Sequence, residues 1–248
     1  MEHPLQKLLT IVLPAYEEAD NLRWLLPQLR CQLDSLGIDY EVIVVDTEQP
    51  RDESPQICRA NDVIYLPRLG GSLYSHALKT GINNSSGKWV LCMDSDGSHA
   101  TSFIPKLWES RNEADIIVAS RYVTGGHTEN PAALIFLSYL VNVIFRLVLG
   151  LECRDLSNSF RLYQGDALRS LSLECQNFDI IEEILLKLNL AKSGFTIREI
   201  PFTFEAHKSG KTKKDLLSFN LTYLVMLRWL HKLKNDVFAK NVRTGSGK

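Results

Sequence analysis

Cysteine is scarce in this sequence, and its spacing excludes two common architectures. The 248 residues include five cysteines, which are widely spaced and form no Cys-x-x-Cys pair. A disulfide framework uses an even number of cysteines in a secreted chain, and a structural zinc site uses closely spaced ligands. Neither is predicted here, and a reducing cytoplasm is the expected location.

Familiar signatures of nucleotide binding and hydrolysis are also missing. No Gly-x-Gly-x-x-Gly, Gly-x-x-x-x-Gly-Lys-Ser/Thr or Gly-x-Ser-x-Gly sequence occurs. These absences argue against a dinucleotide-binding Rossmann domain, a P-loop nucleotidase and a serine hydrolase. The N-terminus lacks the basic segment of a signal peptide, and Pro14 ends its apolar run, so we expect a first strand there.

The chain has almost no net charge, but its charges are unevenly distributed. The formal net charge is −1, yet residues 1–186 hold 15 Lys/Arg against 25 Asp/Glu, whereas residues 187–248 hold 13 against 4. A basic C-terminal quarter indicates an anionic partner, such as phosphate, a membrane surface or nucleic acid. The apolar share of 45% is ordinary for a folded domain and excludes disorder of the whole chain.

Strands and helices alternate along the first half of the chain. Apolar, β-branched segments are followed by segments of helical periodicity. The expected strands are 8–13, 41–46, 62–66, 88–94 and 115–120, and the expected helices are 18–36, 54–60, 72–81 and 103–112. This alternation predicts an α/β fold with a mainly parallel central sheet and helices on both faces.

The second half of the chain is less regular. Its expected elements are an apolar helix at 131–151, strands at 157–164 and 196–204, and helices at 179–190 and 216–233. The sequence has no internal repeat and no low-complexity linker. We therefore expect one domain over residues 1–215, followed by an amphipathic helix and a basic tail over residues 216–248.

Polar and aromatic side chains recur where the expected strands end. They are Pro14, Ala15, Tyr16 and Glu18 after the first strand, Asp46 after the second, Asp94 after the fourth and Arg121 after the fifth. Ligands of open parallel sheets bind beyond the carboxyl ends of the strands. A helix cap explains any one such aspartate, but four converging strand ends favour a ligand site. Gly70-Gly71 allows either a close approach of the backbone to a ligand or a plain turn.

The Asp94-Ser95-Asp96 segment carries the most chemistry. Two carboxylates separated by one residue can bind one cation together. Mg²⁺ and Mn²⁺ prefer such oxygen ligands and keep positions open for substrate phosphates. A turn with two capping aspartates is the alternative, but the position directly after an apolar strand favours the metal.

The motifs, in this order, resemble family 2 glycosyltransferases of the GT-A fold, and within them the polyprenol-phosphate (dolichol-phosphate) mannosyltransferases. The resemblance rests on VLPAYEEADNL, VVD, CMDSDGSH, SRYVTGG and DLSNSFRLY. It implies the GT-A fold and inverting transfer of a hexose, with mannose favoured, from a nucleotide sugar to a polyprenyl phosphate. The implied donor is GDP-mannose in preference to a UDP-sugar.

The resemblance also implies a role for each matching residue. The donor would contact Pro14, Ala15, Tyr16, Glu18, Asp46, Gly71, Asp94 and Ser95. The implied metal ligands for Mg²⁺ or Mn²⁺ are Asp94, Asp96 and Ser98. The acceptor phosphate would meet Arg121, Arg161 and His207, and the implied catalytic residues are Asp96, Arg121 and Lys213.

Three positions depart from the family's pattern. Thr47-Glu48-Gln49 follows Asp46 where the family usually has Asp-Gly/Asn-Ser, and Ser98 replaces a frequent glutamine. His207, in HKSGKTK, stands where the family has an arginine. A solvated basic loop is the alternative interpretation of this last segment.

A long apolar segment, residues 131–151, predicts contact with a membrane. It carries one charge, Arg146, and as a helix it would extend about 30 Å, enough to span a bilayer. Ser138, Asn142 and Arg146 lie at every fourth position and form one polar stripe. The stripe favours an amphipathic helix at the membrane interface over a spanning helix or a buried core helix.

The segment 216–233 repeats this theme near the C-terminus. Trp229 suits the level of the lipid headgroups, and Lys232 and Lys234 follow it. We therefore expect peripheral association with the cytoplasmic face of a membrane.

Three classes of function remain open from the sequence. The favoured class is a glycosyltransferase acting on a lipid phosphate. A second class is a glycosyltransferase for a glycan or a small-molecule acceptor, which would not need the apolar helices. A third is a non-catalytic sugar-nucleotide binder or a nucleotidyltransferase. We expect no nucleic-acid partner.

Overall fold

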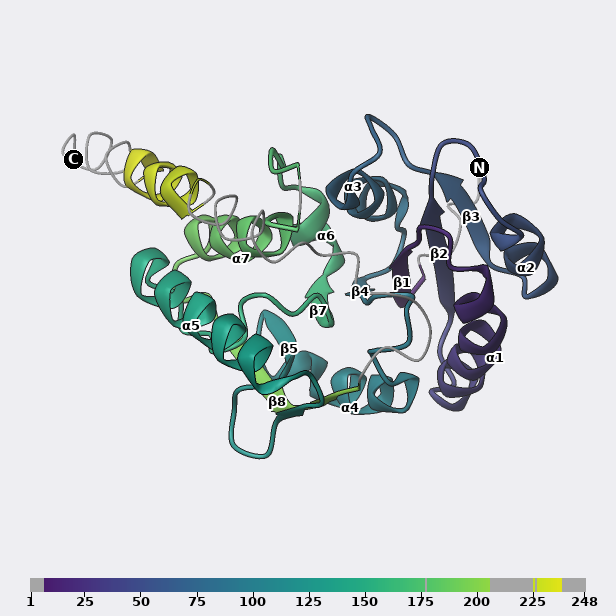
Figure 1. The fold of residues 1–248 in the computed structure, drawn as a ribbon, viewed down its shortest axis with the longest axis horizontal. Coiled ribbons are helices and arrows are strands. Elements are labelled where there is room, and N and C mark those ends of the chain that lie inside the picture. Colours follow the sequence, from purple (N-terminus) through teal and green to yellow (C-terminus); the bar gives the residue numbers. More distant parts are fainter. Residues whose placement is uncertain (1–6, 177, 206–224, 226, 238–248) are drawn as a thin grey trace.

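A seven-stranded sheet forms the centre of the molecule (Figure 1). The computed structural model describes residues 7–176, 178–205, 225 and 227–237. The strand order is β3-β2-β1-β4-β7-β5-β8, and only β7 runs antiparallel to its two neighbours. The strands are β1 (Leu9–Pro14), β2 (Tyr40–Asp46), β3 (Ile64–Pro67), β4 (Trp89–Cys92), β5 (Ile116–Ser120), β7 (Arg161–Gln164) and β8 (Ile197–Pro201). The predicted α/β fold with a mainly parallel sheet is confirmed.

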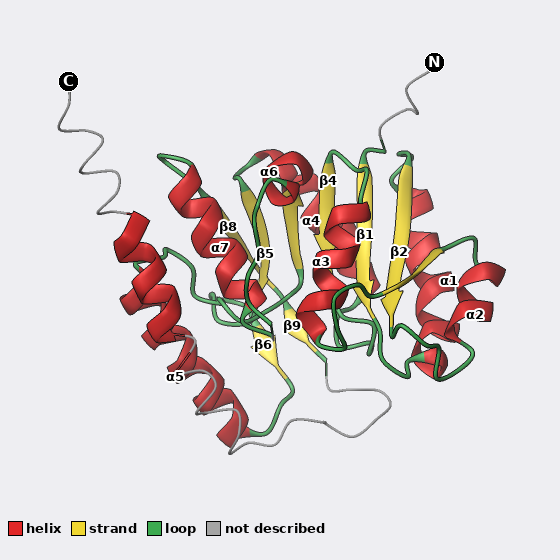
Figure 2. Ribbon diagram, turned by 90° about the horizontal axis from the view of Figure 1, so that it is seen from above, coloured by secondary structure: helices red, strands yellow, loops and turns green. Residues whose placement is uncertain are grey.

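Helices cover both faces of the sheet (Figure 2). They are α1 (Ala19–Ser35), α2 (Ser54–Ala60), α3 (Tyr74–Asn84), α4 (Ile104–Glu109), α5 (Ala132–Leu149), α6 (Gly165–Arg169) and α7 (Ile180–Ala191). Two short strands, β6 (His127–Thr128) and β9 (Thr203–Phe204), pair in parallel as a second, smaller sheet. Helix α5 lies at the opposite end of the molecule from α2 in both views.

Strand β1 shows why the sheet is covered on both sides. Side chains alternate across a strand, and all six residues of β1 are buried, so both of its faces must be covered. Leu9, Ile11 and Leu13 pack in one core with α1 and α4. Val12 faces the other core, which includes residues of α3, α5 and α7.

The structure corrects the expected elements of the second half in two places. The expected strand at 157–164 begins only at Arg161. The residues before Arg161 form a loop that leads into β7, and β7 lies between β4 and β5. The expected strand at 196–204 is divided into β8 and β9. The short elements β6 and α6 have no counterpart among the expected ones.

The C-terminal segment lies partly outside the described residues, which omit 206–224 and 226. Residues 227–237 are helical and pack on the core that contains α7. Leu230 is fully buried, and the Lys234 ammonium donates to the carbonyl of Val148 at the end of α5 (3.3 Å). Trp229 also packs on this core, with the Lys187 ammonium 5.9 Å from its ring centre. Trp229 is only partly buried, and its expected place at the lipid headgroups remains a prediction.

Candidate active site

The polar side chains expected at the strand ends meet at one edge of the sheet. Strands β1, β2, β4 and β5 are parallel in direction, so their carboxyl ends all point to this edge. Strand β7 is antiparallel and therefore starts there. The loop of residues 155–159, which precedes β7, is thus brought between the ends of β4 and β5. We call it the 155–159 loop.

Buried Arg68 joins the ends of β1 and β2. Its guanidinium donates to the carbonyls of Ala15, Asp46 and Ser72. The Asp46 carboxylate is almost fully buried and accepts from the amide of Thr47 (2.7 Å) and the hydroxyl of Tyr65 (3.1 Å). Burial raises the pKa of the Asp46 carboxyl. Arg68 was not among the expected site residues, yet it fixes the backbone around two of them.

The loop after β1 presents Tyr16 and the acidic pair that follows it. The Arg51 guanidinium donates to the Tyr16 hydroxyl (2.9 Å) and lies over its ring, 5.3 Å from the ring centre. Glu18 precedes α1, and its carboxylate accepts from the side-chain amide of Asn21 (2.6 Å). The structure places four of the expected donor residues together: Pro14, Ala15, Tyr16 and Glu18. Their contacts with the donor remain predictions.

Gly71 occupies a turn that explains the glycine without a ligand. Its φ is 146°, and a Cβ there would lie 2.7 Å from the ring of His76. Its donor contact remains a prediction. Ser95 has a local role as well, because its hydroxyl donates to the carbonyl of Pro14 (2.7 Å) and ties the end of β4 to the end of β1.

The Asp94 and Asp96 carboxylates are both partly exposed and both held by hydroxyl groups. Asp94 Oδ1 accepts from the Tyr74 hydroxyl (3.2 Å) and the Ser159 hydroxyl (2.9 Å). Asp96 Oδ1 accepts from the amide and the hydroxyl of Ser98 (3.0 and 2.6 Å). These donors fix the orientation of each carboxylate before any ligand arrives.

Ser98 orients the Asp96 carboxylate through its backbone amide and its hydroxyl. Its side chain is fully buried and its hydroxyl is used by Asp96. The predicted role of Ser98 as a metal ligand remains a prediction.

The buried ring of His99 fixes the backbone of Asp94 through a hydrogen bond. Its Nδ1 accepts from the Asp94 amide (2.9 Å), and its Nε2 donates to Asn158 Oδ1 (3.1 Å). Its ring stacks on Phe160, with 4.8 Å between ring centres. Burial lowers the pKa of His99, which favours the neutral ring that these two hydrogen bonds require.

The donor set at Asp94 and Asp96 fits a hard divalent cation. Within the described part of the chain, no group of three or more His, Cys, Asp or Glu residues could hold a metal. Mg²⁺ is usually held by one or two carboxylates together with substrate phosphates, so two fixed carboxylates satisfy this requirement. The metal role of Asp94 and Asp96 remains a prediction.

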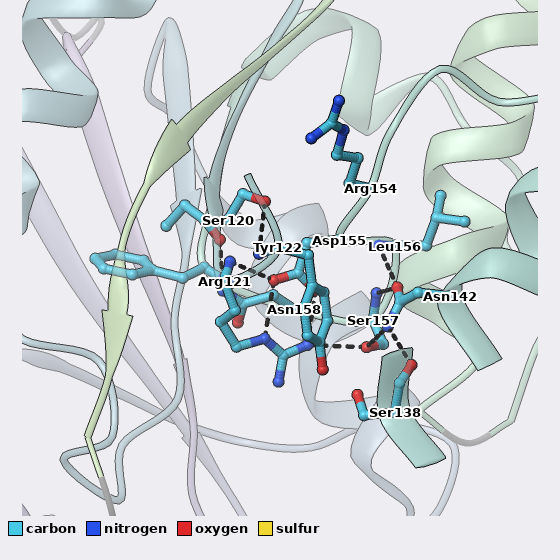
Figure 3. A network of polar contacts seen from close by, with 12 residues as sticks. Ser120, Arg121, Tyr122, Ser138, Asn142, Arg154, Asp155, Leu156, Ser157 and Asn158 are labelled. Carbon is cyan, nitrogen blue, oxygen red and sulfur yellow. Dashed lines mark hydrogen bonds and ion pairs between the residues drawn. The ribbon is translucent and has the colours of Figure 1, made fainter. Parts of the chain in front are cut away.

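Arg121 forms a buried ion pair with Asp155 (Figure 3). Its Nε and Nη2 donate to the two carboxylate oxygens of Asp155 (2.8 and 2.7 Å), and Nη2 also donates to the Ser157 hydroxyl (3.0 Å). The rings of Tyr122 and Phe204 lie 5.1 and 5.5 Å from the guanidinium carbon. A two-bond fork of this kind fixes the plane of the guanidinium.

Arg161 is not part of the site. Its side chain is completely buried, and its guanidinium donates to the carbonyls of Asp155 and Leu156 (3.0 and 2.5 Å). It stabilises the base of the 155–159 loop and cannot reach an acceptor phosphate. The expected roles of His207 and Lys213 fall on residues outside those described.

Helix α5 exposes an apolar surface next to Arg121. Only 17% of its residues are buried, and among the described residues it is the helix that is long and apolar enough to cross a membrane. Its outward side chains include Phe136, Leu140, Ile144 and Leu147, which are 68%, 43%, 38% and 71% exposed. This exposure does not fit the buried-helix alternative. Asn142 of the polar stripe faces the domain.

Comparison with known proteins gives curated relatives of similar sequence. The dolichol-phosphate mannosyltransferase of Pyrococcus furiosus is 29% identical over 230 residues, which is 89% of this chain and 64% of that protein's length. The undecaprenyl-phosphate mannosyltransferase of Micrococcus luteus is 30% identical over 223 residues, 84% of this chain and 87% of that protein.

Solved structures agree with the fold. Glucosyl-3-phosphoglycerate synthase of Mycobacterium tuberculosis, crystallised with Mg²⁺ and uridine diphosphate, superposes with a TM-score of 0.68 at 16% identity over 91% of this chain and 80% of its own. The same enzyme with phosphoglyceric acid gives a TM-score of 0.68 at 17% identity over the same shares of both chains. These likenesses establish the GT-A fold.

The family model for glycosyl transferase family 2 matches residues 10–172, from β1 to the end of the segment that carries α6. All the described strand-end residues of the site lie within this match. The chain therefore belongs to glycosyl transferase family 2.

Proposed function

We propose that this protein transfers a hexose, with mannose favoured, from a nucleotide sugar to the phosphate of a polyprenyl phosphate. The observation that carries the proposal is the 155–159 loop, which contacts both halves of the site. Asp155 and Ser157 bind the Arg121 guanidinium, and Ser159 binds the Asp94 carboxylate. One loop thus fixes an anion-binding cation and a candidate metal carboxylate. The names of both curated relatives support this acceptor.

The donor would lie over the ends of β1, β2 and β4. Tyr16, Glu18 and Asp46 would offer a ring and carboxylates to the nucleoside, and Asp94 and Asp96 would lie on the side of the diphosphate. Mg²⁺ or Mn²⁺ on these two carboxylates would supply charge stabilisation for the departing nucleoside diphosphate. GDP-mannose is the donor that we favour.

The acceptor needs orientation more than activation. A phosphate monoester is already an anion near neutral pH, so no strong protein base has to remove a proton from it. Arg121 would hold this phosphate in line with the anomeric carbon against repulsion from the leaving group. A single displacement of this kind inverts the anomeric configuration.

The apolar face of α5 supports a lipid acceptor over a soluble one. We propose that this face inserts into the interface of a bilayer, on its cytoplasmic side, as a peripheral anchor. The opposite face of the same helix packs against the Arg121 site, so a polyprenyl phosphate could keep its chain in lipid while its phosphate reaches Arg121. A glycan acceptor would not require an exposed apolar surface on this helix.

A donor and acceptor screen tests the proposal. The full chain with Mg²⁺ or Mn²⁺ is offered labelled GDP-mannose, UDP-glucose and related donors, each with polyprenyl phosphate. We expect one donor to label the solvent-extractable lipid. Transfer to a sugar or small-molecule acceptor alone would favour the second class, and donor binding without transfer to any acceptor would indicate a sugar-nucleotide binder.

Membrane binding should depend on the outward face of α5. We expect Leu140→Glu/Ile144→Glu to abolish flotation with liposomes, because both exposed side chains would place charges in the apolar layer. The matched control is Leu8→Glu/Ile64→Glu, which adds the same charges at exposed apolar positions of 40% and 43% on other elements.

Retained donor affinity in the α5 variant would show that the domain stays folded. Flotation equal to that of the control variant would contradict the interfacial anchor. A wild-type protein that resists alkaline carbonate extraction would instead indicate a helix that spans the bilayer.

A further inference from the structure

A fully satisfied amide side chain lies in the middle of apolar helix α5. Asn142 is 1% exposed in a helix whose mean hydropathy is 2.2. Its Oδ1 accepts from the amides of Leu156 and Ser157 (2.6 and 3.1 Å), and its Nδ2 donates to the Ser138 carbonyl (2.8 Å). Burying an amide is costly unless its donors and acceptors are paired, and here both atoms are paired with the protein.

The fourth hydrogen bond of Asn142 leads to the acceptor side of the site (Figure 3). Its Nδ2 donates to the Ser157 hydroxyl (3.0 Å), which also accepts from Arg121 Nη2 (3.0 Å). One hydroxyl therefore stands between the helix and the guanidinium. The path from α5 to Arg121 is two hydrogen bonds long.

We propose that Asn142 is a positioning residue that acts through Ser157 to fix the Arg121 guanidinium for the acceptor phosphate. Asp155 holds one edge of the guanidinium, and Ser157 adds a third bond at Nη2. The inference rests on the proposed function, because it takes Arg121 as the contact of the acceptor phosphate. It adds to that function the link between the helix with the exposed apolar face and this contact.

The position of Asn142 distinguishes this role from simple helix packing. The packing of α5 on the domain uses Phe145 and Leu149, which are almost fully buried in the apolar core. An apolar residue at position 142 could serve packing equally well. Asn142 instead binds two consecutive amides of the 155–159 loop and the hydroxyl that Arg121 uses.

The test compares acceptor kinetics of Asn142→Ala, Ser157→Ala and the double variant. The assay uses a short-chain polyprenyl phosphate in detergent, so that membrane binding does not enter. We expect each single variant to raise the KM for the acceptor up to about tenfold, because one lost orienting hydrogen bond is worth about 0.5–1.5 kcal/mol. The double variant should lose no more than the worse single one, because both substitutions break the same path.

Three controls separate positioning from stability. Val143→Ala, at the next position of α5, should leave acceptor KM unchanged. Ser157→Thr keeps the hydroxyl and should restore most of the acceptor affinity that Ser157→Ala loses. Donor Kd, measured by calorimetry with the nucleotide sugar alone, should stay within twofold of wild type in every variant.

Failure of this inference can be told apart from failure of the proposed function by Arg121→Lys. If Arg121→Lys raises acceptor KM while Asn142→Ala and Ser157→Ala do not, the positioning role is wrong and the acceptor site stands. If Arg121→Lys leaves acceptor KM unchanged, the proposed acceptor contact is wrong. If Asn142→Ala unfolds, Ser157→Ala alone tests the inference, because it leaves the hydrogen bonds from Asn142 to the two loop amides in place. An unchanged acceptor KM in Ser157→Ala would then overturn the inference.

Discussion

Asp96→Asn is expected to lower the turnover of sugar transfer by about 100- to 1000-fold. Losing one group that stabilises developing charge costs about 3 kcal/mol of barrier or more, and Asp96 is one of the two carboxylates that would hold the cation. The fold should persist, because the amide oxygen of Asn can still accept the two hydrogen bonds from Ser98. The measurement is single-turnover transfer in saturating donor and acceptor.

The matched control for this variant is Asp166→Asn. Asp166 lies on α6 and is exposed, paired with Arg169 on the same helix, so the loss of its charge should change neither turnover nor melting temperature. Wild-type turnover that persists in excess chelator would contradict the metal assignment. So would an Asp96→Asn variant with the turnover of the control.

Arg121→Ala is expected to raise the KM for polyprenyl phosphate by about 100-fold, because a hydrogen bond to a charged group is worth about 1.5–3 kcal/mol. Donor Kd should change little, because Arg121 follows β5 and the donor would lie over β1, β2 and β4. The measurement is the change of acceptor KM against the change of donor Kd. Equal losses of both would place Arg121 in the donor site.

The buried partner of Arg121 complicates this variant and suggests a second one. Asp155 is completely buried, and breaking a buried pair by removing one partner costs about 3–5 kcal/mol of stability. Arg121→Lys keeps a charge for Asp155 but loses the planar fork. If Arg121→Lys retains the wild-type melting temperature and still has a raised acceptor KM, the loss belongs to phosphate orientation and not to unfolding.

The residues at the ends of β1, β2, β4 and β5 could be predicted because the strands before them are recognisable from the local sequence alone. Each apolar run ends in Pro14, Asp46, Asp94 or Arg121, and parallel strands bring these ends to one edge whatever the strand order is. The carboxylate pair and its fit to a hard cation follow from the same local pattern. The polar stripe of α5 was also readable, although the sequence alone does not say that Asn142 meets the 155–159 loop.

The supports of these residues could not be predicted, because they depend on pairings between distant segments. The insertion of antiparallel β7 between β4 and β5 brings Asp155 to Arg121 and Ser159 to Asp94. No local periodicity of the sequence indicates this insertion. Arg68 and Arg161 show the same limit, since a buried arginine bonded to backbone carbonyls and an arginine that binds a phosphate look alike in sequence.

The central claim is that the acceptor is a lipid phosphate, and one comparison tests it most directly. A short polyprenyl phosphate and the same polyprenol without its phosphate are offered, in detergent, with the donor that the screen selects and with Mg²⁺ or Mn²⁺. We predict a sugar-labelled lipid with the phosphate and none with the alcohol. Equal labelling of the two lipids, or labelling of neither while a glycan acceptor is used, would contradict it.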